Sequence, residues 1–266
     1  MKSIILSTLP ACARLKASVI ISAPAFSTAA LIKSREYFPE PNINLELNKG
    51  EIVSLLGVSG VGKTTLFQVI SGLVKPDNGT VELNGKNITG ISGEVGYMLQ
   101  KDLLVQYKTV LDNVALPLVI RGEKKKVARE KVSQLFPKFG LDGTQNKYPS
   151  QLSGGMRQRA AFLRTYLFSN EINLLDEPFS ALDAITKGEL HKWYLNIVNS
   201  INLSSIVITH DIDEAIMLSD RIYVMSGSPG SRVSTINVKK DKKQRKDYNL
   251  TEEFLEYKKE ILSKLK

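Results

Sequence analysis

The sequence Gly57-Val58-Ser59-Gly60-Val61-Gly62-Lys63-Thr64 fits the pattern G-x-x-x-x-G-K-[ST] of the phosphate-binding P-loop. The apolar run 51–56 before it predicts a buried strand, and residues 65–70 after it predict a helix that ends near Gly72. A loop between a strand and a helix N-terminus presents unpaired backbone N–H groups and the positive end of the helix dipole to an anion. The segment therefore predicts a phosphate site, against the alternative of a chance glycine-rich turn.

The residue types of this loop suit a nucleoside triphosphate. Glycines let the backbone wrap closely around phosphates because no Cβ stands in the way. Lys63 would reach the β- and γ-phosphates, and the Thr64 hydroxyl would ligate Mg²⁺. The predicted nucleotide-binding residues here are Gly57, Val58, Ser59, Gly60, Val61, Gly62, Lys63, Thr64 and Thr65.

Composition limits the class of protein. The 266 residues, 42% of them hydrophobic, suffice for one large α/β domain or two small ones. The single cysteine, Cys12, excludes a disulfide framework within the chain. The net charge of +9 gathers partly in two basic runs, 123–126 and 239–246, which could serve nucleic acid or an anionic membrane surface. A solvated face or a linker is the simpler interpretation of each run, and no apolar stretch of about eighteen residues is present.

The order of predicted elements divides the chain into three parts. Residues 1–40 contain no acidic residue before Glu36 and are interpreted as an atypical leader, either poorly ordered or diverged at its start. Residues 41–240 alternate strand and helix patterns, which favours an α/β fold with a mainly parallel sheet. Residues of about 101–165 are expected to form a helical insertion in that domain, and 241–266 a basic linker and an amphipathic helix.

Two helices are predicted in detail. In the insertion, residues 124–139 should form a helix that ends near Pro137, with one apolar face of Val127, Val132, Leu135 and Phe136. At the end of the chain, Asn249 and Glu252 have the spacing of a capping box. The helix that follows would carry Phe254, Ile261 and Leu265 on one face, docked on the domain or turned toward a partner.

Further polar residues follow predicted elements at their ends. Gln100 ends a short strand, and Asp176 and Glu177 end the apolar strand that starts at Ile172. Ser153-Gly154-Gly155 begins a helix and is a second possible phosphate contact. His210 ends the strand that starts at Ser205, whereas His191 is expected to be exposed on a helix.

Taken in order, these motifs resemble the ATP-binding subunit of an ABC transporter. The matching set is Gly57–Thr64, Gln100, Leu152-Ser153-Gly154-Gly155-Met156, Leu174-Leu175-Asp176-Glu177, Ser180-Ala181-Leu182-Asp183 and His210. The resemblance covers roughly residues 43–265, and within the family it is similar to importers of the nitrate, sulfonate, taurine and thiamine-precursor type. It implies a P-loop NTPase (RecA-like) core with a small antiparallel β part and an inserted α-helical subdomain.

The resemblance also implies chemistry and assembly. ATP and Mg²⁺ would be the cofactors, with Thr64, Gln100 and Asp176 at the metal. Glu177 would polarise the attacking water, while His210 would contact the γ-phosphate and link it to Glu177, and Lys63 would neutralise charge. Ser153, Gly154 and Gly155 would complete the site of a second subunit, so that two ATPase subunits, most simply a homodimer, work head to tail.

Partners and location follow from the same resemblance. It implies an integral-membrane permease, a solute-binding protein, no nucleic acid, and a peripheral place on the cytoplasmic face of the cell membrane. Met156 departs from the usual glutamine without loss of a catalytic group. The aromatic residue that stacks on adenine is not at its usual place, and Tyr37 is the candidate. Two alternatives remain open, a soluble ABC ATPase acting on DNA or ribosomes and a hydrolysis-defective relic with a damaged N-terminus.

Overall fold

The computed structural model describes residues 16–20, 43–76, 78–227, 232–245 and 247–265. Its main feature is a six-stranded sheet in the order β10-β9-β3-β8-β7-β6, parallel except for the edge strand β10. The strands are β3 (Ile52–Gly57), β6 (Gly96–Met98), β7 (Ile172–Asp176), β8 (Ser204–Thr209), β9 (Arg221–Ser226) and β10 (Arg232–Asn237). The α/β class and mainly parallel sheet expected from the sequence are confirmed.

The three central strands are buried on both faces of the sheet, although they also carry polar residues such as Asn173 and Ser205. Every residue of β3, β7 and β8 is buried, as is typical of parallel sheets. Neighbouring residues of β3 serve different cores, since successive side chains of a strand point to opposite faces. Leu55 packs with Phe67 of α1 (Lys63–Ile70), whereas Leu56 packs with Ala215 of α6 (Ile212–Leu218).

Short antiparallel pairs accompany the main sheet. β4 (Glu82–Leu83) and β5 (Lys86–Asn87) form a short antiparallel hairpin. β1 (Lys16–Ile20) pairs with β2 (Asn44–Asn48) along its whole length. This strand differs from the expectation of a poorly ordered leader. The rest of residues 1–40 lies outside the described residues.

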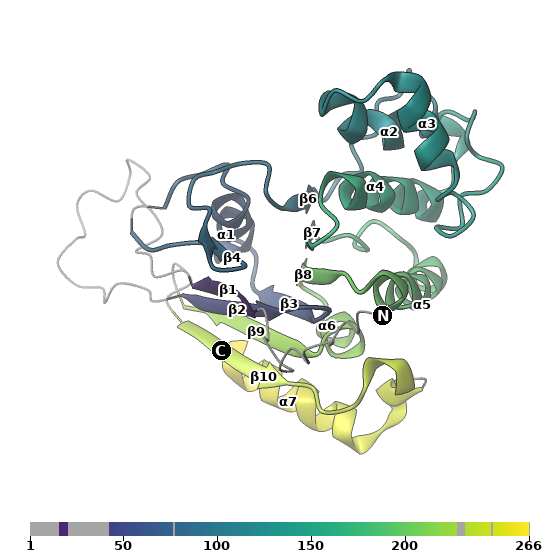
Figure 1. The fold of residues 1–266 in the computed structure, drawn as a ribbon. Helices are drawn as coiled ribbons and strands as arrows, with labels where there is room; N and C mark the ends of the chain where they lie inside the picture. The colour runs from purple at the N-terminus through teal and green to yellow at the C-terminus, as the bar shows by residue number, and fades with distance from the viewer. Residues whose placement is uncertain (1–15, 21–42, 77, 228–231, 246, 266) are drawn as a thin grey trace, which may run out of the picture.

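In the helical insertion, α4 (Gly154–Phe168) lies beside β6, whereas α2 (Val110–Ile120) and α3 (Lys125–Ser133) lie farther from the sheet (Figure 1), with α2 packed against both α3 and α4. The helix predicted over 124–139, with an early end at Pro137, stops four residues before that proline, because α3 ends at Ser133. Pro137 has no N–H to donate to the carbonyl of Ser133, so the helix cannot continue past that point. The apolar face also differs, since Val127 is 42% exposed while Ala128 and Val132 are buried.

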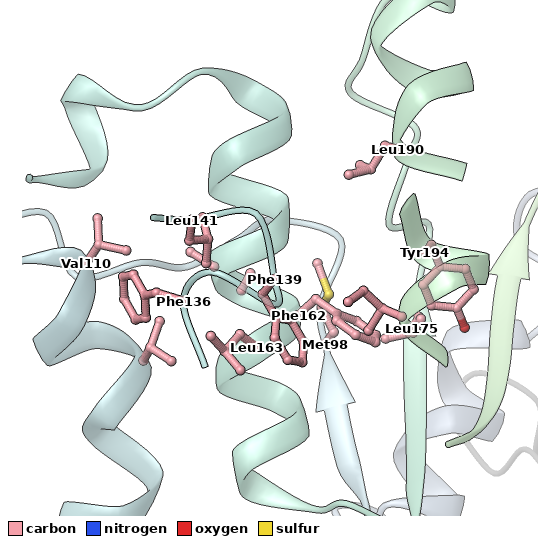
Figure 2. Close-up of a cluster of buried hydrophobic side chains, with 14 of the residues drawn as sticks. Met98, Val110, Phe136, Phe139, Leu141, Phe162, Leu163, Leu175, Leu190 and Tyr194 are labelled. Carbon is pink, nitrogen blue, oxygen red and sulfur yellow. The ribbon is translucent and has the colours of Figure 1, made fainter. Parts of the chain in front are cut away.

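A core of aromatic and aliphatic side chains ties this insertion to the sheet. Figure 2 shows this core running from Phe136 and Leu141 of the insertion, through Phe139 and Phe162, to Leu175 of β7 and Tyr194 of α5 (Ala184–Ile201). Of these, Phe162 meets Tyr194 edge to face, with 5.5 Å between the ring centroids. The position of α4 relative to the ends of the strands is therefore set by a packed core rather than by a single loop.

The C-terminal helix α7 (Glu252–Leu265) packs on α6 and β9, which confirms docking on the domain. Its buried face comprises Phe254, Tyr257 and Ile261. The predicted capping box is wrong, because Asn249 lies in a 3-10 turn (Tyr248–Leu250). The hydroxyl of Thr251 instead accepts from the Phe254 N–H at 3.3 Å. Among the described residues, no helix is both long and apolar enough to cross a membrane.

Candidate active site

The P-loop leaves β3 at Gly57 and enters α1 at Lys63, as predicted. Gly60 (φ 82°) and Gly62 (φ 106°) adopt backbone conformations that favour glycine. Within the described part of the chain, no side chain caps α1, and its first turn holds no acidic residue. Because the first N–H groups of a helix lack an intrahelical partner, this N-terminus keeps a positive field for an anion.

The Lys63 side chain folds over this loop. Its Nζ donates to the carbonyl oxygens of Gly57 at 2.8 Å and of Val58 at 3.0 Å. Burial lowers the pKa of Lys63, and the nearby charges of Glu177 and Asp176 oppose that effect. The ammonium group thus sits between the anion-binding loop and two carboxylates.

Asp176 is placed against the P-loop by the register of the sheet. It ends β7 opposite Ile208 of β8, and its Oδ2 accepts from Thr64 Oγ1 at 3.3 Å and from the Tyr97 hydroxyl at 3.4 Å. Burial raises the pKa of Asp176, although the hydrogen bonds from Thr64 and Tyr97 counter it.

The donors at this place suit Mg²⁺. It takes oxygen ligands, and commonly only one or two come from protein while water and phosphate complete the shell. Thr64 Oγ1 and Asp176 Oδ2 are such a pair of oxygens. No group of three or more His, Cys, Asp or Glu gathers to hold a metal among the residues described. An ion here would therefore depend on nucleotide phosphates and water for most of its ligands.

Glu177 has an unusual backbone and two side-chain partners. Its φ of 46° is a conformation that costs a residue other than glycine roughly 1 kcal/mol or more. The Glu177 N–H donates to the Ile208 carbonyl at 3.0 Å, which holds this conformation. Gln100 Nε2 donates to Oε2 at 3.0 Å, and His210 Nδ1 lies 3.2 Å from Oε1. Two residues from distant parts of the sequence thus orient one carboxylate that is still 21% exposed.

The structure brings most of the predicted site residues together, with two exceptions. Ser153, Gly154 and Gly155 begin α4, where the Ser153 hydroxyl accepts from the Met156 N–H at 3.3 Å. Figure 1 shows this helix apart from α1, so the second helix N-terminus does not share the P-loop's site within one chain. Tyr37 lies outside the described residues.

Sequence reasoning missed several side chains near the site. His191 was expected to be exposed, but its side chain is only 17% exposed and meets the Phe179 ring edge on at 4.7 Å. Tyr97, whose hydroxyl donates to Asp176, is not among the predicted site residues. One feature of the sequence could have placed His191 better. Lys187 and His191 are four residues apart, which puts them next to each other on one face of a helix.

Comparisons with known proteins agree with this geometry. A family model described as "ABC transporter" matches residues 41–180. The formylaminopyrimidine import ATP-binding protein ThiZ of Halalkalibacterium halodurans is 43% identical over 197 residues, which are 74% of this chain and 77% of that protein. The nitrate import ATP-binding protein NrtD of Synechocystis is 37% identical over 231 residues, 85% of this chain and 87% of that protein.

Solved structures show the same fold. That of cbiO1 from Clostridium perfringens, part of the ABC transporter complex cbiONQ, gives a TM-score of 0.68 at 26% identity, over 82% of this chain and 91% of that one. The dimeric structure of MJ0796, a bacterial ABC transporter cassette, gives 0.66 at 26% identity, over 85% and 99%.

Proposed function

The chain belongs to the ABC transporter family as an ATP-binding subunit, and we propose that it hydrolyses ATP to drive import of a solute through a separate permease. Its relatives ThiZ and NrtD are named import ATP-binding proteins, which favours transport over a soluble ABC ATPase acting on DNA or ribosomes. The nitrate importer among them matches the importer group that the sequence resembles.

One observation carries the catalytic part of this function, namely the two side chains that meet on Glu177. Gln100 and His210 contact the Glu177 carboxylate through its two different oxygens. Glu177 directly follows Asp176, whose carboxylate accepts from the P-loop residue Thr64. In this arrangement Glu177 orients and polarises the attacking water, because its exposed carboxylate is a hydrogen-bond acceptor fixed in position. His210 bridges Glu177 and the γ-phosphate.

Groups at the P-loop bind the triphosphate and neutralise its negative charge. The triphosphate lies on the backbone N–H groups of residues 57–65, with Lys63 beside the β- and γ-phosphates. Thr64 and Asp176 would hold Mg²⁺, which would supply further positive charge, and Gln100 is proposed to contact the ion or the water. Tyr37 is proposed to stack on the adenine.

Ser153, Gly154 and Gly155, called the signature residues here, require a second subunit. Ser153, Gly154 and Gly155 begin a helix that lies away from the P-loop of the same chain (Figure 1). We place them against the nucleotide of a second subunit, most simply a second copy, in a head-to-tail dimer. The dimeric cassette among the structural neighbours supports this assembly. ATP would then lie between two helix N-termini, one from each subunit.

The partners in the membrane follow from the family. The neighbour cbiO1 is part of a larger transporter complex. We propose that the chain binds an integral-membrane permease from the cytoplasmic face of the cell membrane, in a system that also has a solute-binding protein.

Substituting Glu177→Gln tests the catalytic assignment. The variant should lose ATP turnover by roughly 10²-fold or more, because an amide cannot accept the proton of the attacking water. It should still bind Mg-ATP, since the phosphate-binding groups are unchanged. Turnover is measured by phosphate release, and binding with a fluorescent ATP analogue.

Glu171→Gln is the matched control. Glu171 is an exposed carboxylate just before the other end of the same strand, so that variant should turn over ATP like the wild type. Normal turnover in Glu177→Gln would overturn the assignment.

A further inference from the structure

Four ionisable side chains form a network beside the site, and none of the roles above uses it. Lys187 Nζ lies 2.6 Å from Asp211 Oδ2 and 3.0 Å from Glu214 Oε2. His191 Nε2 is 3.3 Å from the same Glu214 oxygen, within ion-pair distance but without the geometry of a hydrogen bond. Lys187 and His191 come from one face of α5, and the two carboxylates come from the start of α6.

The pair between Lys187 and the carboxylates is partly sheltered from water. The side chain of Glu214 is 3% exposed and that of Lys187 is 20% exposed. Burial lowers the pKa of Lys187, but hydrogen bonds to Asp211 and Glu214 outweigh burial and leave it above its usual range. For Asp211, burial raises the pKa, but the hydrogen bond and the charge of Lys187 together with backbone N–H donors at the start of α6 lower it below its usual range. Lys187 and Asp211 are therefore both charged at neutral pH. The Asp211 side chain is 36% exposed, so the shelter comes from Lys187 and Glu214, and the short charge-assisted hydrogen bond from Lys187 to Asp211 sets their relative geometry.

One end of this network is the start of α5, which lies against the signature glycines. A Cβ added at Gly154 would lie 3.0 Å from Leu182 Cδ2, and one added at Gly155 would lie 3.3 Å from Thr186 Cγ2. Lys187 follows Thr186 directly. The first turn of α5 is thus in close contact with the segment that we place on the partner's nucleotide.

The other end of the network lies next to the residues that follow Glu177 and His210 in the chain. Asp211 follows His210 directly and caps α6 by accepting from the Glu214 N–H at 3.1 Å. His191 meets the ring of Phe179, which is two residues beyond Glu177. The ion pair thus joins two segments that serve different nucleotides of the proposed dimer.

We propose that Lys187 is a positioning residue whose ion pair with Asp211 fixes the signature segment, through the first turn of α5, relative to His210 and Glu177. Lys187 itself touches no substrate. Its effect on turnover rests on the proposed ATPase function.

The test is the steady-state ATPase activity of the full chain carrying Lys187→Met. Its kcat should fall roughly 10- to 100-fold, because small errors in placing reacting groups have effects of that size. The KM for ATP should stay within about twofold, since the phosphate-binding groups are untouched. Lys187→Arg should restore most of kcat because a guanidinium keeps the charge and the hydrogen bonds.

A second variant keeps the test valid if Lys187→Met folds poorly. Asp211→Asn retains a side-chain oxygen to cap α6 while it removes the charge that faces Lys187. It should show the same loss of kcat. The matched control is Lys258→Met, which breaks an ion pair of Asp213 in the same first turn of α6, with N–O distance 2.7 Å, but this pair joins α6 to α7 and not to α5. That variant should keep the wild-type kcat.

The outcomes separate the two proposals. If the wild type hydrolyses ATP and Glu177→Gln does not, wild-type kcat in folded Lys187→Met or Asp211→Asn overturns the positioning role alone. An equal loss of kcat in Lys258→Met also overturns it, because the loss would then follow from breaking any ion pair of α6 and not from the pair of Lys187 with Asp211. A wild type that fails to hydrolyse ATP under all conditions overturns both.

Discussion

At the scale of single residues, Gly96 shows how closely the site is packed. It begins β6, the strand that leads to Gln100. A Cβ added there would lie 2.1 Å from the Asn173 side-chain amide of β7 and 3.0 Å from Thr165 of α4. Neither neighbour can withdraw easily, because both are buried. The absence of a side chain at Gly96 is what lets the strand before Gln100 lie against the strand that ends at Asp176.

We expect Gly96→Ala to destabilise the chain by about 1–3 kcal/mol, the usual cost of overpacking a core. Gly188→Ala is the matched control, because it lies within α5 and an added Cβ meets nothing within 4 Å. Alanine there should raise stability by roughly 0.5–1 kcal/mol through helix propensity. Urea unfolding measures both variants. Shifts of the same sign in the two would contradict the packing argument.

At the scale of elements, Arg245 fastens the C-terminal segment to α6. Its guanidinium donates to the carbonyls of Ile216, Met217 and Ser219 at the end of α6, at 2.7 to 3.2 Å. It also donates twice to the carbonyl of Lys240. Arg245 is 2% exposed, so this part of the basic run 239–246 is an anchor and not the solvated face expected from its charge.

Arg245→Met should therefore cost roughly 3 kcal/mol of unfolding free energy, because it leaves several carbonyls without their charged donor. α7 packs on α6 next to this anchor and should loosen as well. The control is Lys239→Met, an exposed cation of the same run, which should change stability by no more than about 0.5 kcal/mol. Hydrogen exchange of α6 and α7, together with thermal unfolding, measures both effects. Equal protection in the two variants would contradict the anchor.

At the scale of the whole molecule, the chain offers two surfaces for other subunits. In the proposed dimer, the P-loop and Glu177 would form one half of a nucleotide site, and the start of α4 would be the half that serves a partner. The large aromatic core between the insertion and the sheet holds these halves in a fixed relation within the chain. The proposed function therefore needs an assembly to complete the site.

The tagged chain, purified from detergent-solubilised membranes, should bring with it a polytopic permease identified by mass spectrometry. This follows from the proposed peripheral attachment to a membrane subunit. Recovery of ribosomal or DNA-repair proteins without any permease would instead favour the soluble ABC ATPase. A tagged chain purified from the soluble fraction is the control for non-specific capture.

Much of the site could be predicted from the sequence because its motifs are local. A strand, a glycine-rich loop and a helix in succession place Lys63 and Thr64 without any distant contact. Apolar strands ending in Asp176 and in His210 predict a meeting place, since parallel strands end at the same edge of a sheet. The α/β class followed from the same alternation of elements.

The tertiary structure decided what depends on residues far apart in the chain. Val127 and Ala128 are both apolar, and only the position of α3 against α2 shows that Ala128 faces the core. His191 and Arg245 read as exposed polar residues, yet packing of α5, α6 and the C-terminal segment buries them. The ion pair of Lys187 with Asp211 has the same origin. Local patterns specify elements and their ends, whereas long-range contacts depend on how elements pack, which no short stretch of sequence encodes.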